Sequence, residues 1–243
     1  MNDNDSFSST GGTARLSIVM PVLNEAATIQ AALAPLQFLR ARGHEVIVVD
    51  GGSRDATLEC ARGLVDSAIT CGRGRARQLN EGLAYATGDV VVLLHADTVL
   101  PDLADSRILE ALADAKYAWG RFDVHIAGRS PWLPIVAAMM NSRSRLTGIA
   151  TGDQAMFARR AVLQSIGGVP PLSLMEDIAL SRRLKRVSPP ACLRERVVTS
   201  GRRWEANGAL RTIVLMWALR LAFFLGISPE RLARAYYTPR GAA

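Results

Sequence analysis

The chain has 243 residues, which suits one α/β domain with elaborations or two small domains, and it is long enough to bury a sizeable core. Apolar residues make up 49% and charged residues 21%, which argues against a largely disordered protein. The formal net charge of +7 is nearly all arginine and fits either an anionic partner or compositional drift, but no nucleic-acid-binding signature accompanies it, so no nucleic-acid partner is expected.

The N-terminus and the cysteines indicate the compartment. Residues 1–14 are polar and lack the basic and apolar regions of a signal peptide, so we expect a disordered tail. Cys60, Cys71 and Cys192 lie far apart and form no CxxC pair, which argues against a zinc site or a disulfide framework. We therefore expect the protein to be cytoplasmic.

The first half of the chain alternates apolar runs with helical segments. Short apolar runs rich in β-branched residues predict buried strands at 16–22, 45–50 and 90–95, and a further short strand is expected at 68–70. Helices are expected between them, at 25–42 with Asn24 as cap and a break at Pro35, from Asp55 to about 63, and at 75–86. This alternation predicts an α/β fold with a mostly parallel central sheet flanked by helices, in which ligands bind beyond the carboxyl ends of the strands.

The second half is less regular. An exposed strand or hairpin is expected at 117–126, a helix at 131–146, a turn and strand from Gly152, a helix at 175–186 and a strand at 192–199. The apolar run 213–227 is shorter than a membrane span and carries Arg220 at its centre. We expect the helical segment 206–243 to pack on the domain or to lie on a membrane surface, with contact through 211–237 and with Arg211, Arg220, Arg231 and Arg234 as its basic residues.

Acidic residues follow three of the predicted strands. Glu25, Asp50 and Asp97 would meet at one rim of the sheet, where each alone would serve equally well as a helix cap. Because clustered carboxylates repel, such a group usually holds a cation or a ligand, and oxygen ligands favour Mg²⁺ or Mn²⁺. The segment Gly72 to Arg77 (GRGRAR) reads as a phosphate-binding turn or as a basic surface loop.

The chain resembles the family 2 glycosyltransferases, which have the GT-A fold. The resemblance runs from about Leu16 to Arg186 and rests on six segments in the family's order: SIVMPVLNEAATI, VVDGGSRDAT, GRGRARQLNEGL, LLHADTVLP, TGDQAMFARR and MEDIALSRRL. The strings LHADT, GDQA and RRWEANG are similar to a bacterial subgroup described as radical-SAM/selenodomain-associated or arsenosugar-biosynthesis glycosyltransferases. The resemblance implies a transferase domain at 15–205, with a nucleotide-binding half at about 15–100 and an acceptor half at about 101–205.

The resemblance also implies roles for matching residues. HADT stands at the DxD-type motif, so Asp97 would hold the divalent cation, with His95 as a ligand or as a donor-binding residue. MED stands at the pair that supplies the general base, which would be Asp177, with Glu176 as the alternative. The other donor-binding residues would be Pro21, Glu25, Asp50, Ser53, Arg77 and Arg203, and the acceptor region would include Asp153, Gln154 and Trp204.

Two departures from the family pattern matter. Gly51 stands where the family often has a second acid, which puts uracil specificity in doubt, and His95 replaces the first acid of DxD. The expected reaction moves a sugar from a nucleotide-sugar donor to a hydroxyl of a small-molecule or lipid-linked acceptor, with inversion. A nucleotidyltransferase would need a glycine-rich loop after the first strand, which PVLNEAAT lacks. A non-catalytic membrane-peripheral protein with a relict GT-A fold is the other alternative.

Overall fold

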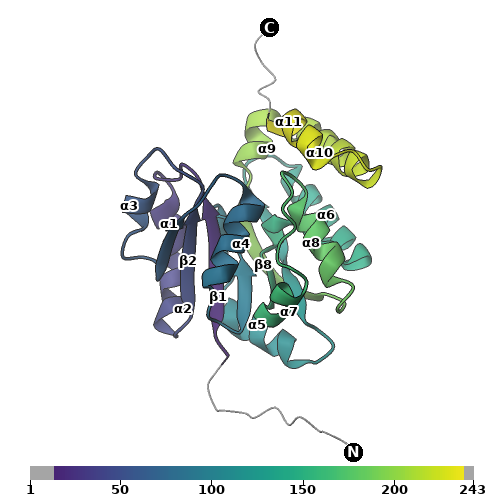
Figure 1. Cartoon of the computed structure of the whole chain (residues 1–243). Coiled ribbons are helices and arrows are strands. Elements are labelled where there is room, and N and C mark those ends of the chain that lie inside the picture. Colours follow the sequence, from purple (N-terminus) through teal and green to yellow (C-terminus); the bar gives the residue numbers. More distant parts are fainter. Residues whose placement is uncertain (1–13, 238–243) are drawn as a thin grey trace, which may run out of the picture.

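The computed structural model describes residues 14–237 and is built on one eight-stranded sheet (Figure 1). The strand order is β3-β2-β1-β4-β7-β6-β8-β5. The strands are β1 (Leu16–Val22), β2 (Glu45–Asp50), β3 (Ser67–Thr70), β4 (Val90–Leu93), β5 (Thr98–Val99), β6 (Trp119–Ala127), β7 (Met156–Arg159) and β8 (Ala191–Ser200). The first four strands of the order are parallel, β7 is antiparallel to both of its neighbours, and β8 returns parallel to β6 and antiparallel to β5.

Helices cover both faces of this sheet. They are α1 (Ile29–Leu33), α2 (Gln37–Ala41), α3 (Thr57–Ala61), α4 (Arg75–Tyr85), α5 (Ala104–Ala113), α6 (Leu133–Thr147), α7 (Arg160–Ser165), α8 (Glu176–Leu184), α9 (Arg202–Asn207), α10 (Ala209–Phe224) and α11 (Pro229–Tyr237), with 3₁₀ turns η1 (Ala34–Leu36) and η2 (Gly152–Gln154). Alternation along β1 divides the core, since Ile18 and Met20 pack with α1, α2, α5 and α6, whereas Val19 packs with α4, α7 and α8. The predicted α/β fold is therefore confirmed.

A buried polar network fixes α6 to the sheet. Arg121 of β6 is fully buried and pairs with Asp123, whose carboxylate also accepts from Arg145 of α6 at 2.7 Å. The side chain of Asn141 bonds both backbone groups of Val124, with its Nδ2 donating at 3.0 Å and its Oδ1 accepting at 2.9 Å. These bonds join α6 to β6, although the Nε of Arg121 has no hydrogen-bond partner among the described residues.

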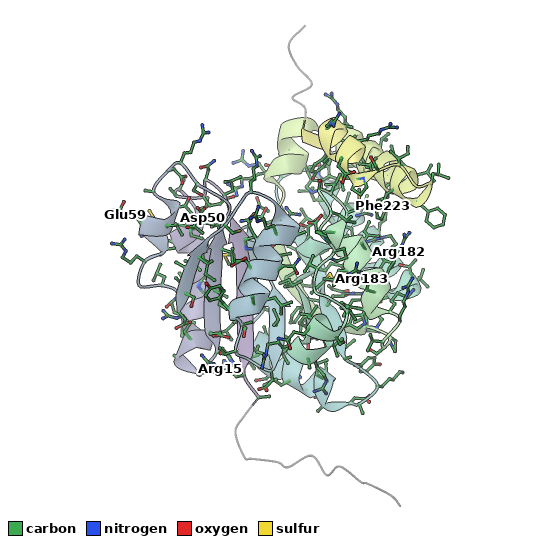
Figure 2. The ribbon with its side chains drawn as sticks, in the orientation of Figure 1. Arg15, Asp50, Glu59, Arg182, Arg183 and Phe223 are labelled. Atoms are coloured by element: carbon green, nitrogen blue, oxygen red, sulfur yellow. The ribbon has the colours of Figure 1, made fainter. Side chains whose placement is uncertain are left out.

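The C-terminal helices lie over the upper end of the sheet in Figure 1. A third apolar cluster joins Leu174, Met175 and Ile178 at the start of α8 to Leu219 of α10 and Leu232 of α11. The guanidinium of Arg182 also stacks on Phe223, 5.5 Å from its ring centre (Figure 2). Within residues 14–237, no helix combines the length and the apolar character that crossing a bilayer requires.

The structure corrects two of the expected elements. The helix expected from Glu25 begins only at Ile29, because Asn24 takes a left-handed conformation (φ 54°) and bonds the neighbouring loop instead of capping a helix. Its predicted break at Pro35 is confirmed by η1. The segment expected to be an exposed strand at 117–126 is β6, whose first four residues are buried between β7 and β8. Most of the 1–14 tail lies outside the described residues.

Candidate active site

Two loops at the carboxyl ends of β1 and β2 are hydrogen-bonded together. The Asn24 amide donates to Ser53 Oγ at 2.8 Å, and Asn24 Oδ1 accepts from the amide of Arg54 at 2.9 Å. The Glu25 amide donates to Thr57 Oγ1 at 2.8 Å. These bonds fix the loop that carries Pro21 and Glu25 against the loop that carries Asp50 and Ser53, so the two strand ends form one continuous rim.

Asp50 closes its own turn at the end of β2. It is 2% exposed, and its carboxylate accepts from the amides of Gly52 and Ser53 at 3.1 and 2.9 Å and from the Ser53 hydroxyl. The turn is supported from below by Gln78 of α4, whose Nε2 donates to the carbonyls of Val22 and Val49. Asp50 therefore shapes the rim beside the site rather than presenting a free carboxylate.

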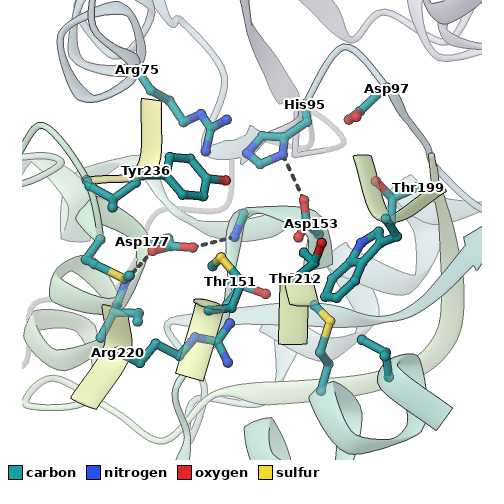
Figure 3. A pocket seen from close by; sticks show the side chains of 18 of the residues that line it. Arg75, His95, Asp97, Thr151, Asp153, Asp177, Thr199, Thr212, Arg220 and Tyr236 are labelled. Carbon is teal, nitrogen blue, oxygen red and sulfur yellow. Dashed lines mark hydrogen bonds and ion pairs between the residues drawn. The ribbon is translucent and has the colours of Figure 1, made fainter. Parts of the chain in front are cut away.

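His95 and Asp153 approach each other from opposite halves of the chain. His95 follows β4 and Asp153 lies in η2, and His95 Nδ1 is 3.3 Å from Asp153 Oδ1 (Figure 3). The other edge of the imidazole lies directly over Gly152, where a Cβ atom would collide with it. Glycine at position 152 is thus needed for the ring to reach Asp153.

The first turn of α8 contributes the pair Glu176 and Asp177. Asp177 Oδ2 accepts from the Gly152 amide at 3.0 Å and Oδ1 accepts from the Ile178 amide at 2.7 Å. Glu176 is 5% exposed and its Oε1 lies 3.4 Å from Arg75 Nη1. The preceding Met175 has φ 67°, a costly conformation for a side chain with a Cβ, of the kind that persists where surrounding structure imposes it.

These residues line one cavity of about 450 Å³. Eight of the predicted site residues contribute to its wall: Pro21, Glu25, His95, Asp97, Asp153, Glu176, Asp177 and Trp204. The loops that follow β1 and β4 contribute to the wall of the cavity, together with residues of α6 and α10. The carboxylate of Asp97 accepts a hydrogen bond from the Thr98 hydroxyl at 3.4 Å.

Other predicted residues lie outside the cavity lining. Asp50 and Ser53 form the adjacent turn, and Gln154 is fully buried, where its Oε1 accepts from the Thr151 amide at 3.2 Å. The guanidinium of Arg77 folds back over Gly72. The predicted residue Arg203 belongs to α9, and its side chain is outside the part of the chain that the structure describes.

Three further arginines line the cavity, of which Arg75 belongs to the segment expected to be a phosphate-binding turn or a basic surface loop, whereas Arg143 and Arg220 were not predicted there. Arg75 lies two positions before Arg77 on α4 and lines the cavity, whereas Arg77 does not. The two side chains differ because residues two apart on a helix point in widely different directions. Arg143 of α6 and Arg220 of α10 line its inner end. The helix that carries Arg220 was expected either to pack on the domain or to lie on a membrane surface, and Arg220 was not predicted as a site residue. The position of Arg220 within an apolar run could have indicated a site residue, because a charged side chain on a packed helix needs a polar environment.

The surrounding charges perturb three groups. Burial raises the pKa of Glu176, and the neighbouring charge of Asp177 raises it further, while Arg75 opposes the shift. Enclosure raises the pKa of Asp153, but the hydrogen bond and charge of His95 outweigh it, so this pKa lies below its ordinary value. Burial, then the charge of Arg220, lowers the pKa of Arg143 to about 10, and its guanidinium remains charged at neutral pH.

The acids of the site do not enclose a cation by themselves. Among residues 14–237, no group of three or more His, Cys, Asp or Glu side chains is assembled to hold a metal ion. Asp97 nevertheless presents an exposed carboxylate to the cavity. Mg²⁺ and similar hard cations are commonly held by one or two carboxylates together with substrate phosphates, and this donor set fits that mode.

Comparisons with known proteins agree with this geometry. The model of glycosyl transferase family 2 matches residues 17–166. Poly-beta-1,6-N-acetyl-D-glucosamine synthase of Staphylococcus epidermidis is 28% identical over 189 residues, which cover 70% of this chain and 45% of that protein. The synthase of Staphylococcus aureus strain COL is also 28% identical, over 187 residues, with the same coverage. The chain thus spans less than half the length of these curated relatives.

Solved structures share the fold at low identity. Mannosyltransferase PcManGT from Pyrobaculum calidifontis, solved with GDP-Man and Mn²⁺, is 23% identical with a TM-score of 0.57, covering 77% of this chain and 57% of that chain. Glucosyl-3-phosphoglycerate synthase from Mycobacterium tuberculosis, solved with Mn²⁺, UDP and glucosyl-3-phosphoglycerate, is 23% identical with a TM-score of 0.58, covering 76% and 71%. These neighbours confirm the expected GT-A-type architecture.

Proposed function

The chain belongs to glycosyl transferase family 2, and on that premise we propose that it moves a sugar from a nucleotide-sugar donor to an acceptor hydroxyl, with inversion and with the aid of a divalent cation. The observation that carries this proposal is the placement of Asp177 and Asp97 on the wall of one cavity, beside the strand ends that form the rim. We further propose the domain division 15–205 and 206–243, with the nucleotide-binding half at about 15–100.

Asp177 is the proposed general base. Two backbone amides fix its carboxylate, and the side chain keeps access to the cavity. As the acceptor oxygen bonds to the anomeric carbon, Asp177 takes the hydroxyl proton, and the bond from that carbon to the diphosphate breaks with its electron pair on the departing nucleotide. Glu176 is less suited, because its raised pKa reduces its charge and its oxygen is engaged by Arg75.

Asp97 is the proposed ligand of Mg²⁺ or Mn²⁺. His95 is less available as a second ligand while its Nδ1 faces Asp153, and we propose that it positions Asp153 and the donor. A divalent cation bound there would supply positive charge to the departing diphosphate. Arg75 would add charge-assisted hydrogen bonds from the nucleotide side, and Arg77 and Arg203 remain proposed donor contacts. Pro21, Glu25, Asp50 and Ser53 would line the nucleotide pocket, and Gln154 and Trp204 would support the acceptor side.

The acceptor and subgroup are also proposals. LHADT, GDQA and RRWEANG support membership of the arsenosugar-biosynthesis-type subgroup and a small diffusible acceptor. The nucleotides bound in the solved neighbours, GDP-Man and UDP, support a nucleotide-sugar donor here.

We propose that the protein is cytoplasmic and that its segment 211–237 makes peripheral contact with an anionic membrane. Support comes from apolar side chains at the far end of α10, where Phe224 is 73% and Leu225 is 71% exposed, with exposed Arg231 nearby. Co-sedimentation with vesicles tests this contact. The wild-type chain should bind phosphatidylglycerol vesicles, and Phe224→Ser should weaken that binding. The proposed contact would be contradicted if the wild-type chain and Phe224→Ser were recovered equally with these vesicles and with neutral phosphatidylcholine vesicles.

A thermal-shift screen of nucleotide-sugars with Mn²⁺ tests the central proposal. A donor present at about 100 times its Kd stabilises a protein by roughly 2.7 kcal/mol, so a matching donor should raise the Tm clearly. NMR of the product would then give its anomeric configuration. Stabilisation by a nucleoside triphosphate with turnover to a nucleotide-sugar would favour a nucleotidyltransferase instead.

A further inference from the structure

Two helices present matched stripes to the inner end of the cavity. On α6 the lining residues are Val136, Met139, Met140 and Arg143, and on α10 they are Thr212, Ile213, Met216, Trp217 and Arg220. Both sets recur at the three- and four-residue spacing of one helix face. Each stripe is mostly apolar and ends in an arginine, and the two arginines are close enough for the charge of Arg220 to lower the pKa of Arg143.

These guanidinium groups have unmet hydrogen-bonding capacity. Nε and Nη2 of Arg143 and Nε of Arg220 are buried and have no hydrogen-bond partner among the described residues. Among the described residues, no carboxylate lies within ion-pair distance of Arg143 or Arg220. The charge of Asp177 acts on Arg143 only at longer range. Leaving buried charged donors unsatisfied is costly, and here the two like charges also repel.

The position of Arg220 separates it from the expected diphosphate site. Figure 3 shows Arg75, His95 and Asp97 along one side of the cavity, with Asp153 and Asp177 between them and Arg220. An anion at the arginine pair would therefore lie beyond the proposed base, on the side from which the acceptor approaches. One such anion would satisfy the unpaired donors and relieve the repulsion between the two arginines.

We propose that Arg143 and Arg220 bind an anionic group of the acceptor, a phosphate or a carboxylate, and thereby direct a neighbouring hydroxyl toward Asp177. This inference rests on the proposed function, which it deepens by naming the acceptor's class. The apolar stripes of Met139, Met216 and Trp217 would contact the uncharged part of the acceptor. The anionic group can belong to a soluble molecule or to a lipid headgroup.

Inorganic phosphate is the first probe. The wild-type chain, saturated with UDP and Mn²⁺, is titrated with phosphate and its Tm is recorded. Arg143→Met and Arg220→Met keep an unbranched apolar stem but remove the guanidinium and its charge, and each should weaken phosphate binding about tenfold or more. Arg186→Met, an exposed position outside the cavity lining, is the matched control and should leave phosphate binding unchanged. Equal phosphate binding in all four proteins would overturn the proposal.

Acceptor assays distinguish the sources of the anion. Sugar transfer is measured to glycerol 3-phosphate, to phosphatidylglycerol vesicles and to neutral glycerol. Higher kcat/KM for either anionic acceptor, lost in the two variants, supports the proposal and identifies a soluble or a lipid-borne group. Preference for glycerol, or variants that lose UDP affinity instead of phosphate affinity, would overturn it. If the wild-type chain neither binds UDP with Mn²⁺ nor hydrolyses any nucleotide-sugar, the proposed function itself fails, and the phosphate titration without nucleotide still decides whether the anion site exists.

Discussion

The Nδ1 atom of His95 lies 3.3 Å from Oδ1 of Asp153, and this pair joins the end of β4 to η2 across the wall of the cavity. The contact depends on Gly152, which leaves room for the imidazole and also donates its amide to Asp177. One residue thus positions groups on both sides of the proposed reaction centre.

Gly152→Ala should therefore impair catalysis more than folding. The added methyl group displaces His95 and shifts the amide that orients Asp177, and small misplacements of reacting groups can lower rates by about 10²-fold. Turnover is measured with a nucleotide-sugar, and circular dichroism and Tm check the fold. Wild-type turnover in a folded variant would show that the His95–Asp153 pair has no role in positioning.

Asp177→Asn should reduce turnover by about 10²–10⁴-fold, because the amide accepts no proton from the acceptor hydroxyl. Donor affinity, measured by calorimetry with Mn²⁺, should stay within about twofold, since the proposed base contacts the acceptor. Glu176→Gln is the companion variant and should retain far more activity. A larger loss of turnover in Glu176→Gln than in Asp177→Asn would transfer the base role to Glu176.

Glu176→Gln should also change the pH dependence of stability. Burial and Asp177 raise the pKa of Glu176 in the folded state, so this group favours folding most below its unfolded pKa and loses that contribution as pH rises through the folded pKa. At pH 7–8 the neutral variant should be the more stable protein, and the difference should vanish near pH 4. A gain on the order of 1 kcal/mol corresponds to about 2–4 °C in Tm for a chain of this size. A variant less stable than wild type at pH 8 would mean that the Arg75 contact outweighs burial.

The strand-end residues of this site could be predicted because parallel strands deliver their carboxyl ends to one edge. Glu25, Asp97 and Asp177 line the cavity as that rule and the family resemblance indicated. The arginines at the inner end could not be predicted in the same way. Arg143 and Arg220 line the same cavity only because α10 folds back across the domain. That packing is long-range. Locally, Arg220 is no more than an interruption of an apolar run.

Contacts between segments that are distant in sequence explain the other differences. Asn24 has the side chain of a helix cap, yet it accepts from the amide of Arg54 in the next loop, so the helix begins later than its pattern predicts. The alternation in 117–126 predicts an exposed strand or hairpin, but Trp119 and Phe122 of β6 are buried because they pack in the two apolar clusters on the faces of the sheet.

Metal binding should depend on the nucleotide. Since no described group of three side chains is assembled for a cation, Mn²⁺ alone should give little heat in calorimetry, and the same titration with UDP present should give clear binding. Asp97→Asn should remove that nucleotide-dependent binding while leaving the Tm of the apo protein nearly unchanged, because the side chain is exposed. Tight Mn²⁺ binding without nucleotide, or binding that survives Asp97→Asn, would contradict this assignment.

Arg75 and Arg77 offer a direct comparison between the cavity geometry and the family resemblance. Arg75 lines the cavity and contacts Glu176, whereas the guanidinium of Arg77 lies over Gly72. Arg75→Met should therefore weaken UDP binding in the presence of Mn²⁺ by about tenfold, the cost of a lost charge-assisted hydrogen bond, and Arg77→Met should weaken it less. Calorimetry at two salt concentrations checks that the Arg75 effect is electrostatic, because screening should reduce it. The reverse order of the two variants would mean that Arg77 leaves Gly72 when the nucleotide binds, so that the loop from Gly72 to Gly74 closes over the diphosphate.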